Sequence, residues 1–200
     1  MRLPAEQRRR QLLDVARDVF AERGFHATSM DDVAIAAGVT KPVLYQHFRN
    51  KRALYVELLE DVGRELLERL SAATHEVDSG RERVERGFTA YFRWVADRPS
   101  AFRLLFGASV RNDPEFAAVS ERVVGEVAYA ISPLIAIAVD DEHRLVLANA
   151  LVGMAEATSR RSLAGDDGDP DDKDHAEHLA WWIAEMAWFG LRGVRADDGD

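Results

Sequence analysis

The sequence predicts an all-α protein, in which a three-helix N-terminal unit of the helix-turn-helix type precedes a larger domain of about six helices. Apolar side chains recur at intervals of three and four residues along most of the chain, as on one face of a helix. No segment shows the strict alternation of a strand, and Gly, Pro and Asp residues separate the periodic segments. With 200 residues, 47% of them hydrophobic, the chain is long enough to bury a sizeable core.

The first two helices are predicted from their apolar faces and their caps. The first is expected over residues 8–23, whose apolar side chains share one face, and Gly24 follows as a C-terminal cap. The second is short and begins after Ser29, because Ser29 and Asp32 have the spacing of a capping box. It ends at Gly38, which tolerates the positive φ that a sharp turn between two helices requires.

The third helix is predicted to begin at Thr40, a natural N-cap, with Pro42 in its first turn. Leu44 and Phe48 are four residues apart and are expected to face inward. The opposite, outward face then carries Lys41, Val43, Gln46 and His47. Since an α-helix fits the major groove of DNA, this arrangement is typical of a recognition helix.

Longer helices are expected in the rest of the chain, separated by Pro, Gly and Asp-rich breaks. Their predicted ranges are 51–73, 80–97, 99–108, 114–139, 141–163 and 173–193. Pro133 is expected to kink or split the helix over 114–139, because proline cannot donate a backbone hydrogen bond.

The charges are divided unevenly along the chain, whose formal net charge is -9. Residues 1–53 carry ten Lys and Arg against six Asp and Glu, which gives +4, and the remaining residues carry -13. Affinity for phosphate depends on local charge. The basic N-terminal unit is therefore compatible with nucleic acid, although unselected drift in surface charge could give the same asymmetry.

Several classes of protein are disfavoured. The absence of cysteine excludes disulfides and thiolate sites, and no cofactor is expected because no phosphate-binding loop or nucleophile elbow occurs. The N-terminal stretch lacks the apolar run of a signal peptide, so we expect a cytoplasmic protein without a membrane span. A metal-dependent helical enzyme that uses His175 and His178 is a remote alternative, since neither histidine has a recognised catalytic spacing.

The stretch Thr40 to Leu54, TKPVLYQHFRNKRAL, together with the preceding Ser-x-x-Asp-Val-Ala-x-x-Ala-Gly-Val, resembles the TetR-type bacterial transcriptional regulators. The resemblance implies a DNA-binding domain over residues 1–53 and an effector-binding and dimerisation domain over residues 54–195. The acidic residues 196–200 are expected to form a frayed tail. The resemblance also implies a regulator, and we expect a repressor that an apolar small molecule releases from DNA. A DNA-binding dimer without a small-molecule ligand remains the alternative.

The resemblance also implies roles for individual residues in DNA binding. Tyr45, His47 and Lys51 would contact phosphates, and Thr28 or Ser29 would contact the backbone at the start of the second helix. Residues facing the base edges would be Lys41, Val43 and Gln46, which suit guanine, the thymine methyl and adenine in that order. The DNA-contacting set is completed by Thr40 and Pro42.

Near Asp31 some family members carry a basic, base-reading residue, so this chain departs from the pattern there. The cluster Arg8 to Arg10 could add backbone contacts from an arm ahead of the first helix, or could form a solvated basic turn.

For the larger domain, the resemblance implies an apolar ligand pocket and a two-fold homodimer. Candidate ligand-binding residues are Phe88, Tyr91, Phe92, Phe102, Phe106 and Asn149, although an aromatic stripe at helical spacing can equally be core. Candidate dimer residues are Ala148, Leu151, Ala155, Trp182, Met186 and Phe189. A two-fold dimer would bind a palindromic operator in double-stranded DNA.

Overall fold

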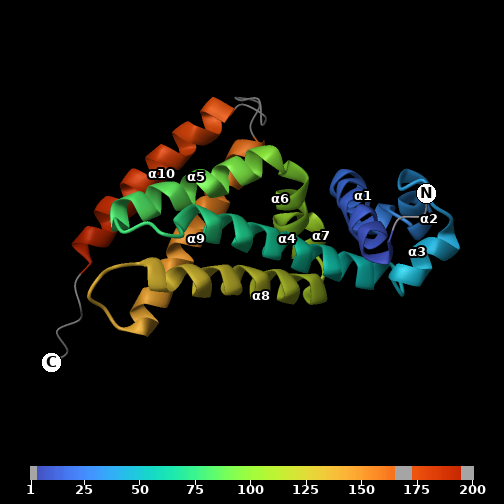
Figure 1. Cartoon of the computed structure of the whole chain (residues 1–200), viewed down its shortest axis with the longest axis horizontal. Coiled ribbons are helices and arrows are strands. Elements are labelled where there is room, and N and C mark those ends of the chain that lie inside the picture. The colour runs from blue at the N-terminus through green and yellow to red at the C-terminus, as the bar shows by residue number, and fades with distance from the viewer. Residues whose placement is uncertain (1–3, 165–172, 195–200) are drawn as a thin grey trace. The chain divides into compact units, whose positions relative to one another are not determined.

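The structure is a computed structural model that describes residues 4–164 and 173–194, and over those residues it consists of helices and connecting turns with no strand (Figure 1). The N-terminal helices are α1 (Ala5–Ala27), α2 (Met30–Ala36), α3 (Lys41–His47) and α4 (Lys51–Thr74). They are followed by α5 (Gly80–Asp97), α6 (Pro99–Phe106), α7 (Ala108–Arg111), α8 (Pro114–Ile131), the 3-10 helix η1 (Ser132–Leu134), α9 (Asp141–Ala164) and α10 (Lys173–Gly193).

The all-α prediction is therefore confirmed. No helix among the described residues is both long and apolar enough to cross a bilayer.

The chain divides into two compact units, and the division differs from a simple cut after residue 53. Unit 1 combines the chain up to Gly63 with Ser100–Val123, and unit 2 combines Arg64–Pro99 with the chain from Val124 onward. Helices α4 and α8 therefore contribute residues to both units. The predicted functional boundary at residue 53 stays a prediction, and the predicted tail 196–200 lies outside the described residues.

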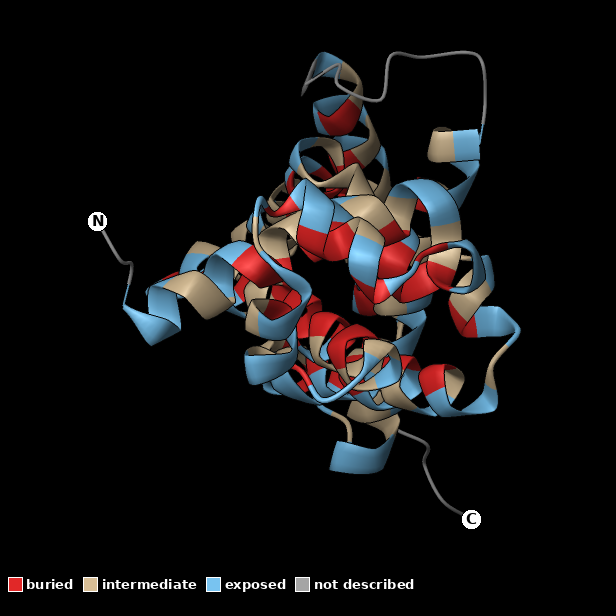
Figure 2. Cartoon of the chain, turned by 90° about the vertical axis from the view of Figure 1, so that its right-hand side faces the viewer, coloured by how far each residue is buried: buried red, intermediate tan, exposed pale blue. Residues whose placement is uncertain are grey.

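Unit 1 has a core of aromatic and aliphatic side chains, part of which is marked as buried in Figure 2. Phe25 and Phe116 pack edge to face with ring centroids 4.7 Å apart, and Tyr55 lies 4.5 Å from Phe116. These contacts join α1 to α4 and α8, while α1 also packs on α2 and α7. Burial of such aromatic pairs is a main source of stability in a small unit.

A change of direction inside α1 is made possible by Gly24, which has a φ of +75°. The prediction ended the first helix here, but the chain resumes a helical turn as far as Ala27. Glycine was thus correctly identified as the point where the helix is interrupted. Phe25 directly follows the interruption and lies in the core, where its side chain is only 7% exposed.

Unit 2 is built around α5, along which α10 packs, with α9 in contact with α5, α10 and η1 (Figure 1). Trp94 on α5 is fully buried, and Ala180, Ala184 and Ala187 on α10 allow the two helices to approach closely. A further group of buried side chains, formed by Ala128, Ile135, Ala148 and Leu191, links the end of α8 to α9 and α10.

The helix expected over 114–139 is broken near Pro133, as predicted, because α8 ends at Ile131 and the chain passes into η1; it does not resume before residue 139. Pro133 lies in this 3-10 turn, where its missing N–H and its ring are tolerated better than in the interior of an α-helix. The prediction for 99–108 is also too long, since α6 ends at Phe106 and α7 begins after the extended residue Gly107. A Cβ at Gly107 would lie 2.1 Å from the carbonyl oxygen of Arg103.

Candidate nucleic-acid interface and apolar pocket

The start of α2 is fixed by the predicted capping box. The backbone N–H of Asp32 donates to Ser29 Oγ at 3.1 Å, and the backbone N–H of Ser29 donates to Asp32 Oδ2 at 2.8 Å. Hydrogen bonds from the side chain and backbone of Ser29 lower the pKa of Asp32. The capping box thus satisfies two backbone donors and orients the first turn of α2.

The turn between α2 and α3 has the predicted geometry. Gly38 has a φ of +63°, and the next residue, Val39, donates its N–H to the carbonyl of Ala34 at 3.0 Å. Ala34 itself is 3% exposed, which allows the two short helices to pack closely. These features set the angle at which α3 leaves α2.

Helix α3 is attached to unit 1 by its inner face. Leu44 is fully buried and Phe48 is 2% exposed, as predicted. Thr40 occupies the N-cap position, although its side chain makes no capping hydrogen bond, and Pro42 lies in the first turn. With this inner face fixed, α3 presents its other side chains to solvent as a rigid set.

The solvent-facing side of α3 carries the residues predicted to contact DNA. Tyr45 is 43% exposed, Lys41, Pro42 and Gln46 are also exposed, and Val43 and His47 are partly buried. Ser29 is exposed at the start of α2, and Lys41 Nζ donates to Asp31 Oδ2 at 2.9 Å. The predicted base-facing residues therefore share one short helix with Tyr45.

Two predicted phosphate contacts have other interactions in this structure. Thr28 is 1% exposed and donates its hydroxyl to the Gly24 carbonyl at 2.9 Å, so its side chain does not belong to the exposed surface. Lys51 Nζ donates to the carbonyls of Phe25 and Thr28, each at 2.8 Å, and lies 4.3 Å from the centroid of the Phe25 ring. Burial lowers the pKa of Lys51. The lysine therefore supports the turn before α2, and its contact with phosphate stays a prediction.

The basic cluster near the N-terminus lies within α1, so both expectations for it, an arm ahead of the first helix and a solvated basic turn, are wrong. Arg9 donates to the carbonyl of His47 at 2.6 Å and to Glu57 Oε2 at 2.5 Å, with its guanidinium 4.5 Å from the centroid of the Phe48 ring. Arg10 pairs with Asp61 at 2.7 Å. Sequence reasoning missed these roles, because the partners lie 38 to 51 residues away along the chain.

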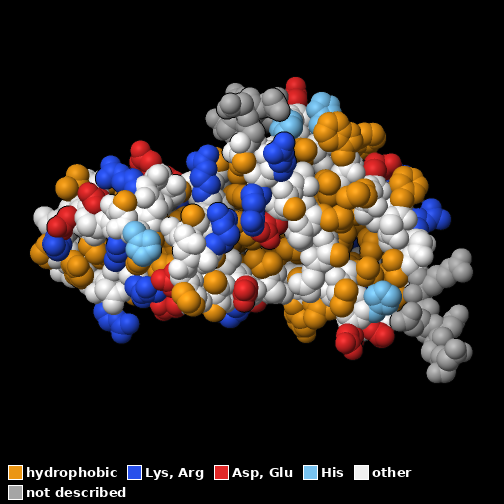
Figure 3. All heavy atoms as spheres, turned by 180° about the vertical axis from the view of Figure 1, so that it is seen from behind, with side chains coloured by type: hydrophobic (Ala, Val, Ile, Leu, Met, Phe, Trp, Pro, Cys, Tyr) orange, Lys and Arg blue, Asp and Glu red, His pale blue; other side chains and the backbone are white. Residues whose placement is uncertain are grey.

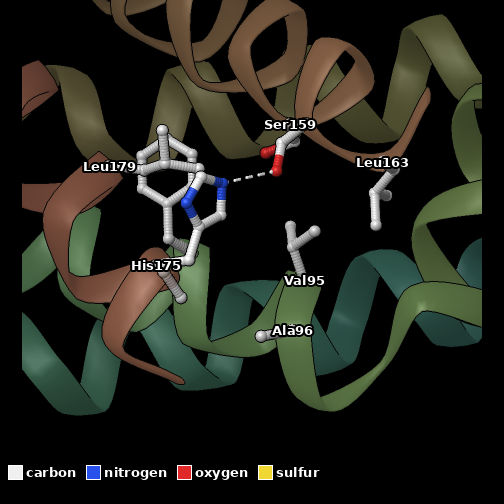
Figure 4. A pocket seen from close by; sticks show the side chains of 9 residues that line it. Val95, Ala96, Ser159, Leu163, His175 and Leu179 are labelled. Atoms are coloured by element: carbon white, nitrogen blue, oxygen red, sulfur yellow. Dashed lines mark hydrogen bonds between the residues drawn. The ribbon is translucent and has the colours of Figure 1, made fainter. Parts of the chain in front are cut away.

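A second candidate site is an apolar pocket in unit 2, between α5, α9 and α10 (Figure 4). The cavity that it encloses is small, about 20 Å³. Its lining is mostly apolar, with two serines and one histidine: Phe92, Val95, Ala96, Ser159, Ser162, Leu163, His175, Ala176 and Leu179. Ser162 Oγ and His175 Nε2 are hydrogen-bonded at 3.0 Å.

Three polar atoms on α5 and α9 are buried without a hydrogen bond of normal geometry, namely Tyr91 Oη, Trp94 Nε1 and Ser159 Oγ, and of these residues Ser159 lines the pocket. Burial raises the pKa of Tyr91 well above its usual value, an effect that the neighbouring Ser159 hydroxyl partly offsets. Since buried polar groups without partners are costly, the Ser159 hydroxyl is suited to a hydrogen bond with a molecule that enters the pocket.

The predicted ligand-binding residues are only partly brought together. Phe92 lines the pocket, and Phe88 and Tyr91 are buried on the same helix. Phe102 and Phe106 belong to unit 1 and pack on each other with centroids 4.8 Å apart. Asn149 is exposed and donates to the Leu145 carbonyl at 2.8 Å, so it does not line this pocket. The serines and His175 were missed as pocket residues because polar residues at helix ends also occur on solvated surfaces.

The outer face of α9 and α10 is unusually apolar, as the hydrophobic side chains in Figure 3 show for unit 2. Trp181, Trp182, Met186 and Phe189 on α10 are 54 to 60% exposed, and Val146 on α9 is 61% exposed. Of the predicted dimer residues, Trp182, Met186 and Phe189 face outward and Leu151 is half-buried. Ala148 and Ala155 instead face the interior of unit 2, at 0% and 4% exposure. Gly153 and Gly190 have open space where a Cβ would stand.

The capped α2, the turn at Gly38 and the exposed, internally anchored α3 together define a helix-turn-helix DNA-binding protein with a helical body. Known proteins support this class. Residues 12–58 match the family model described as bacterial regulatory proteins, tetR family. The chain is 33% identical over 195 residues to the HTH-type transcriptional activator FasR of Mycolicibacterium smegmatis, which covers 96% of this chain and 87% of FasR.

A further relative and a solved structure are also transcriptional regulators. The HTH-type transcriptional repressor Rv1474c of Mycobacterium tuberculosis is 37% identical over 111 residues, which cover 55% of this chain and 54% of that protein. The crystal structure of a TetR-like transcriptional regulator from Rhodococcus sp. RHA1 has a TM-score of 0.73 at 29% identity, covering 96% of this chain and all of the other.

The chain belongs to the TetR family of bacterial transcriptional regulators. It is therefore a DNA-binding regulator of transcription and not an enzyme. Within residues 4–164 and 173–194, no group of three His, Asp or Glu residues is arranged to hold a metal ion. His175 instead contacts Ser162, and the ring of His178 stacks on Trp182 with centroids 6.0 Å apart.

Proposed function

We propose that the chain is a cytoplasmic repressor that binds a palindromic operator as a homodimer and is released by an apolar small molecule. The observation that carries the proposal is the outer surface of α3, where Lys41, Tyr45 and Gln46 are exposed while Leu44 is fully buried. A rigid helix with donors and acceptors on one face can read base edges in the major groove.

The individual contacts follow from the chemistry of the side chains. Lys41 would donate to guanine, Gln46 would bond adenine through its amide, and Val43 would pack on a thymine methyl. Tyr45, His47, Ser29 and Lys51 would contact the phosphate backbone. Removing one base contact such as Gln46 should cost about 1 to 3 kcal/mol and relax specificity at a single position.

The pocket in unit 2 supports a ligand that is mostly apolar with one polar end, such as a lipid, an acyl thioester or a hydrophobic drug. Aliphatic and aromatic side chains would surround the apolar part, and Ser159, Ser162 and His175 could bond the polar end. The cavity as it stands, about 20 Å³, holds about one water molecule. A larger ligand would have to change the packing of α9 and α10 on α5, which gives binding a way to favour another conformation.

Helix α4 supports a coupling between ligand and DNA, because Leu54 and Leu58 are buried in unit 1 and Leu66 and Leu70 are buried in unit 2. A ligand that binds better to a conformation unsuited to the operator would shift the population away from DNA. The coupling free energy could not exceed RT times the natural logarithm of the ratio of ligand affinities for the two conformations.

DNA binding is tested by fluorescence anisotropy on the DNA upstream of the gene and on a scrambled duplex, across a salt series. We expect tight binding to a palindrome only, weakened by salt and by the double variant Tyr45→Phe, His47→Ala. Equal, weak binding to both duplexes, and to duplexes selected from a random pool, would contradict the proposal.

Ligand binding is tested by thermal unfolding with fatty acids, long-chain acyl-CoA thioesters and hydrophobic drugs. A ligand present at a hundred times its Kd stabilises by about 2.7 kcal/mol. Ala96→Leu, which narrows the pocket, should reduce this stabilisation, and Ala118→Leu on the exposed side of α8 should not. A compound that saturates the protein without changing operator affinity would contradict the coupling.

The direction of regulation is tested with a reporter under the operator-bearing promoter. Repression predicts that reporter expression rises when the regulator is deleted and when the inducing compound is added. The relatives are named both as activator, in FasR, and as repressor, in Rv1474c. A fall in expression on deletion would therefore assign this chain to the activators.

A further inference from the structure

A side-chain ion pair connects the two short helices of the N-terminal unit. Lys41 Nζ, at the start of α3, donates to Asp31 Oδ2, in the first turn of α2, at 2.9 Å. The lysine side chain is 54% exposed and the aspartate side chain 55%. Exposed pairs of this kind contribute little to folding stability. Stability therefore does not explain why this pair lies on the surface that is proposed to contact DNA.

The pair changes what Lys41 can offer to DNA. A lysine strengthens binding to any duplex when its charge replaces a counterion at a phosphate. Here a carboxylate already compensates that charge, and the same carboxylate would approach the phosphates together with the ammonium. The pair as a whole is neutral and would add little to binding that does not depend on sequence.

The pair leaves the hydrogen-bonding capacity of Lys41 largely intact. An ammonium has three donors, and Asp31 accepts from one of them. Two donors remain for acceptors such as O6 and N7 of guanine. The hydrogen bond to Asp31 raises the pKa of Lys41, so the ammonium keeps its protons.

We propose that Asp31 is a specificity-determining residue, which makes Lys41 a donor to bases while cancelling its attraction to phosphates. The proposal rests on the proposed function of α3 as the helix that contacts DNA. Asp31 itself acts through Lys41, because it positions the ammonium and compensates its charge. Its effect is therefore larger on the ratio of specific to non-specific affinity than on affinity for the operator.

The test is a cycle of four proteins, the wild type, Asp31→Asn, Lys41→Gln and the double variant. Each is titrated onto a random-sequence duplex and onto an operator duplex selected from a random pool, over a range of salt concentrations. Glu22→Gln serves as the control, because it removes the same charge from an acid on α1 whose side chain is 75% exposed.

On random DNA, Asp31→Asn should steepen the slope of log affinity against log salt concentration by about 0.9 for each DNA-binding domain that is bound. That corresponds to a roughly 3.5-fold larger loss of affinity between 50 and 200 mM salt. Lys41→Gln alone and Glu22→Gln should leave the slope unchanged, and the double variant should return to the wild-type slope. The ratio of operator to random affinity should fall in Asp31→Asn.

Three results would overturn the proposal. A slope that falls by about 0.9 in Lys41→Gln would mean that Lys41 already neutralises a phosphate in the wild type. A steepening that persists without Lys41, or that equals the one in Glu22→Gln, would assign the effect to net charge alone. By contrast, a wild type that binds operator and random DNA equally would contradict the proposed function. The salt slopes on random DNA would still test the role of Asp31.

Discussion

At the scale of single residues, Arg9 holds the C-terminal end of α3. Its guanidinium joins the last carbonyl of α3, at His47, to Glu57 on α4 and covers the ring of Phe48. A cation near the C-terminus of a helix also stabilises the helix dipole. The orientation of α3 thus depends on a residue of α1 that need not touch DNA itself.

Replacing Arg9 by Gln should therefore loosen α3 more than the rest of unit 1. We expect a loss of about 1 kcal/mol, since the Arg9 and Glu57 side chains are 38% and 29% exposed and solvent weakens the pair. Hydrogen exchange should show reduced protection in α3, and operator affinity should fall with an unchanged salt slope.

Arg8→Gln is the matched control, because Arg8 donates to Gln11 within α1. A salt slope that falls in Arg9→Gln would instead assign Arg9 to a phosphate contact.

The capping box makes a prediction about pH. Hydrogen bonds from Ser29 lower the pKa of Asp32 below its ordinary value of 3.8, so the folded state favours the carboxylate. A carboxyl group whose pKa is depressed on folding contributes stability above the unfolded value, and that stability is lost as the pH falls through the folded value. The difference in unfolding free energy between wild type and Asp32→Asn should be constant above about pH 5 and shrink below pH 3.8. Urea titrations at several pH values measure it, and a constant difference down to the lowest pH would contradict it.

At the scale of helices, Gly63 on α4 packs directly against Val123 on α8. A Cβ placed on Gly63 would lie 2.2 Å from Cγ1 of Val123, far inside a normal contact. Val123 is β-branched and 2% exposed, so it has little freedom to move aside. The glycine is therefore explained by packing and not by backbone conformation.

Gly63→Ala should destabilise the protein. Alanine gains about 1 kcal/mol of helix propensity over glycine, whereas overpacking a buried contact costs about 1 to 3 kcal/mol. Because the neighbour is stiff, we expect the packing cost to win by about 1 kcal/mol in urea unfolding. Gly125→Ala on α8 has open space around its Cβ and should stabilise instead. Stabilisation by both substitutions would show that Val123 moves aside easily.

The helices also show how far a single sequence can predict this fold. Caps and turns were predictable because Ser29, Asp32 and Gly38 act on residues only a few positions away. The contacts of Lys51 and Arg9 were not, because their partners come from helices distant in the sequence. Periodicity also failed on α9, which has apolar residues on all sides, so the outward position of Asn149 and the inward one of Ala148 could not be distinguished.

At the scale of the whole molecule, the apolar outer face of α9 and α10 is the surface through which the proposed homodimer would form. Four large side chains of α10, Trp181, Trp182, Met186 and Phe189, are each more than half exposed, an arrangement that is unfavourable in water. On α9, small residues follow one exposed stripe at positions 150, 153 and 157. Large side chains beside a stripe of small ones suit a self-complementary, two-fold contact between helices.

This dimer can be tested at Gly153, where a Cβ would meet nothing within the chain. If a partner covers the α9–α10 face, Gly153→Leu will place a large side chain in the contact and shift the protein from dimer to monomer in analytical ultracentrifugation. Operator affinity should then fall steeply, because two linked DNA-binding domains bind one palindrome far more tightly than one domain binds a half-site.

Gly125→Leu is the matched variant, since Gly125 is also helical and open but lies on α8. It should remain dimeric and keep its operator affinity. A Gly153→Leu protein that stays dimeric would place the dimer contact elsewhere, and the exposed tryptophans of α10 would then require a different partner.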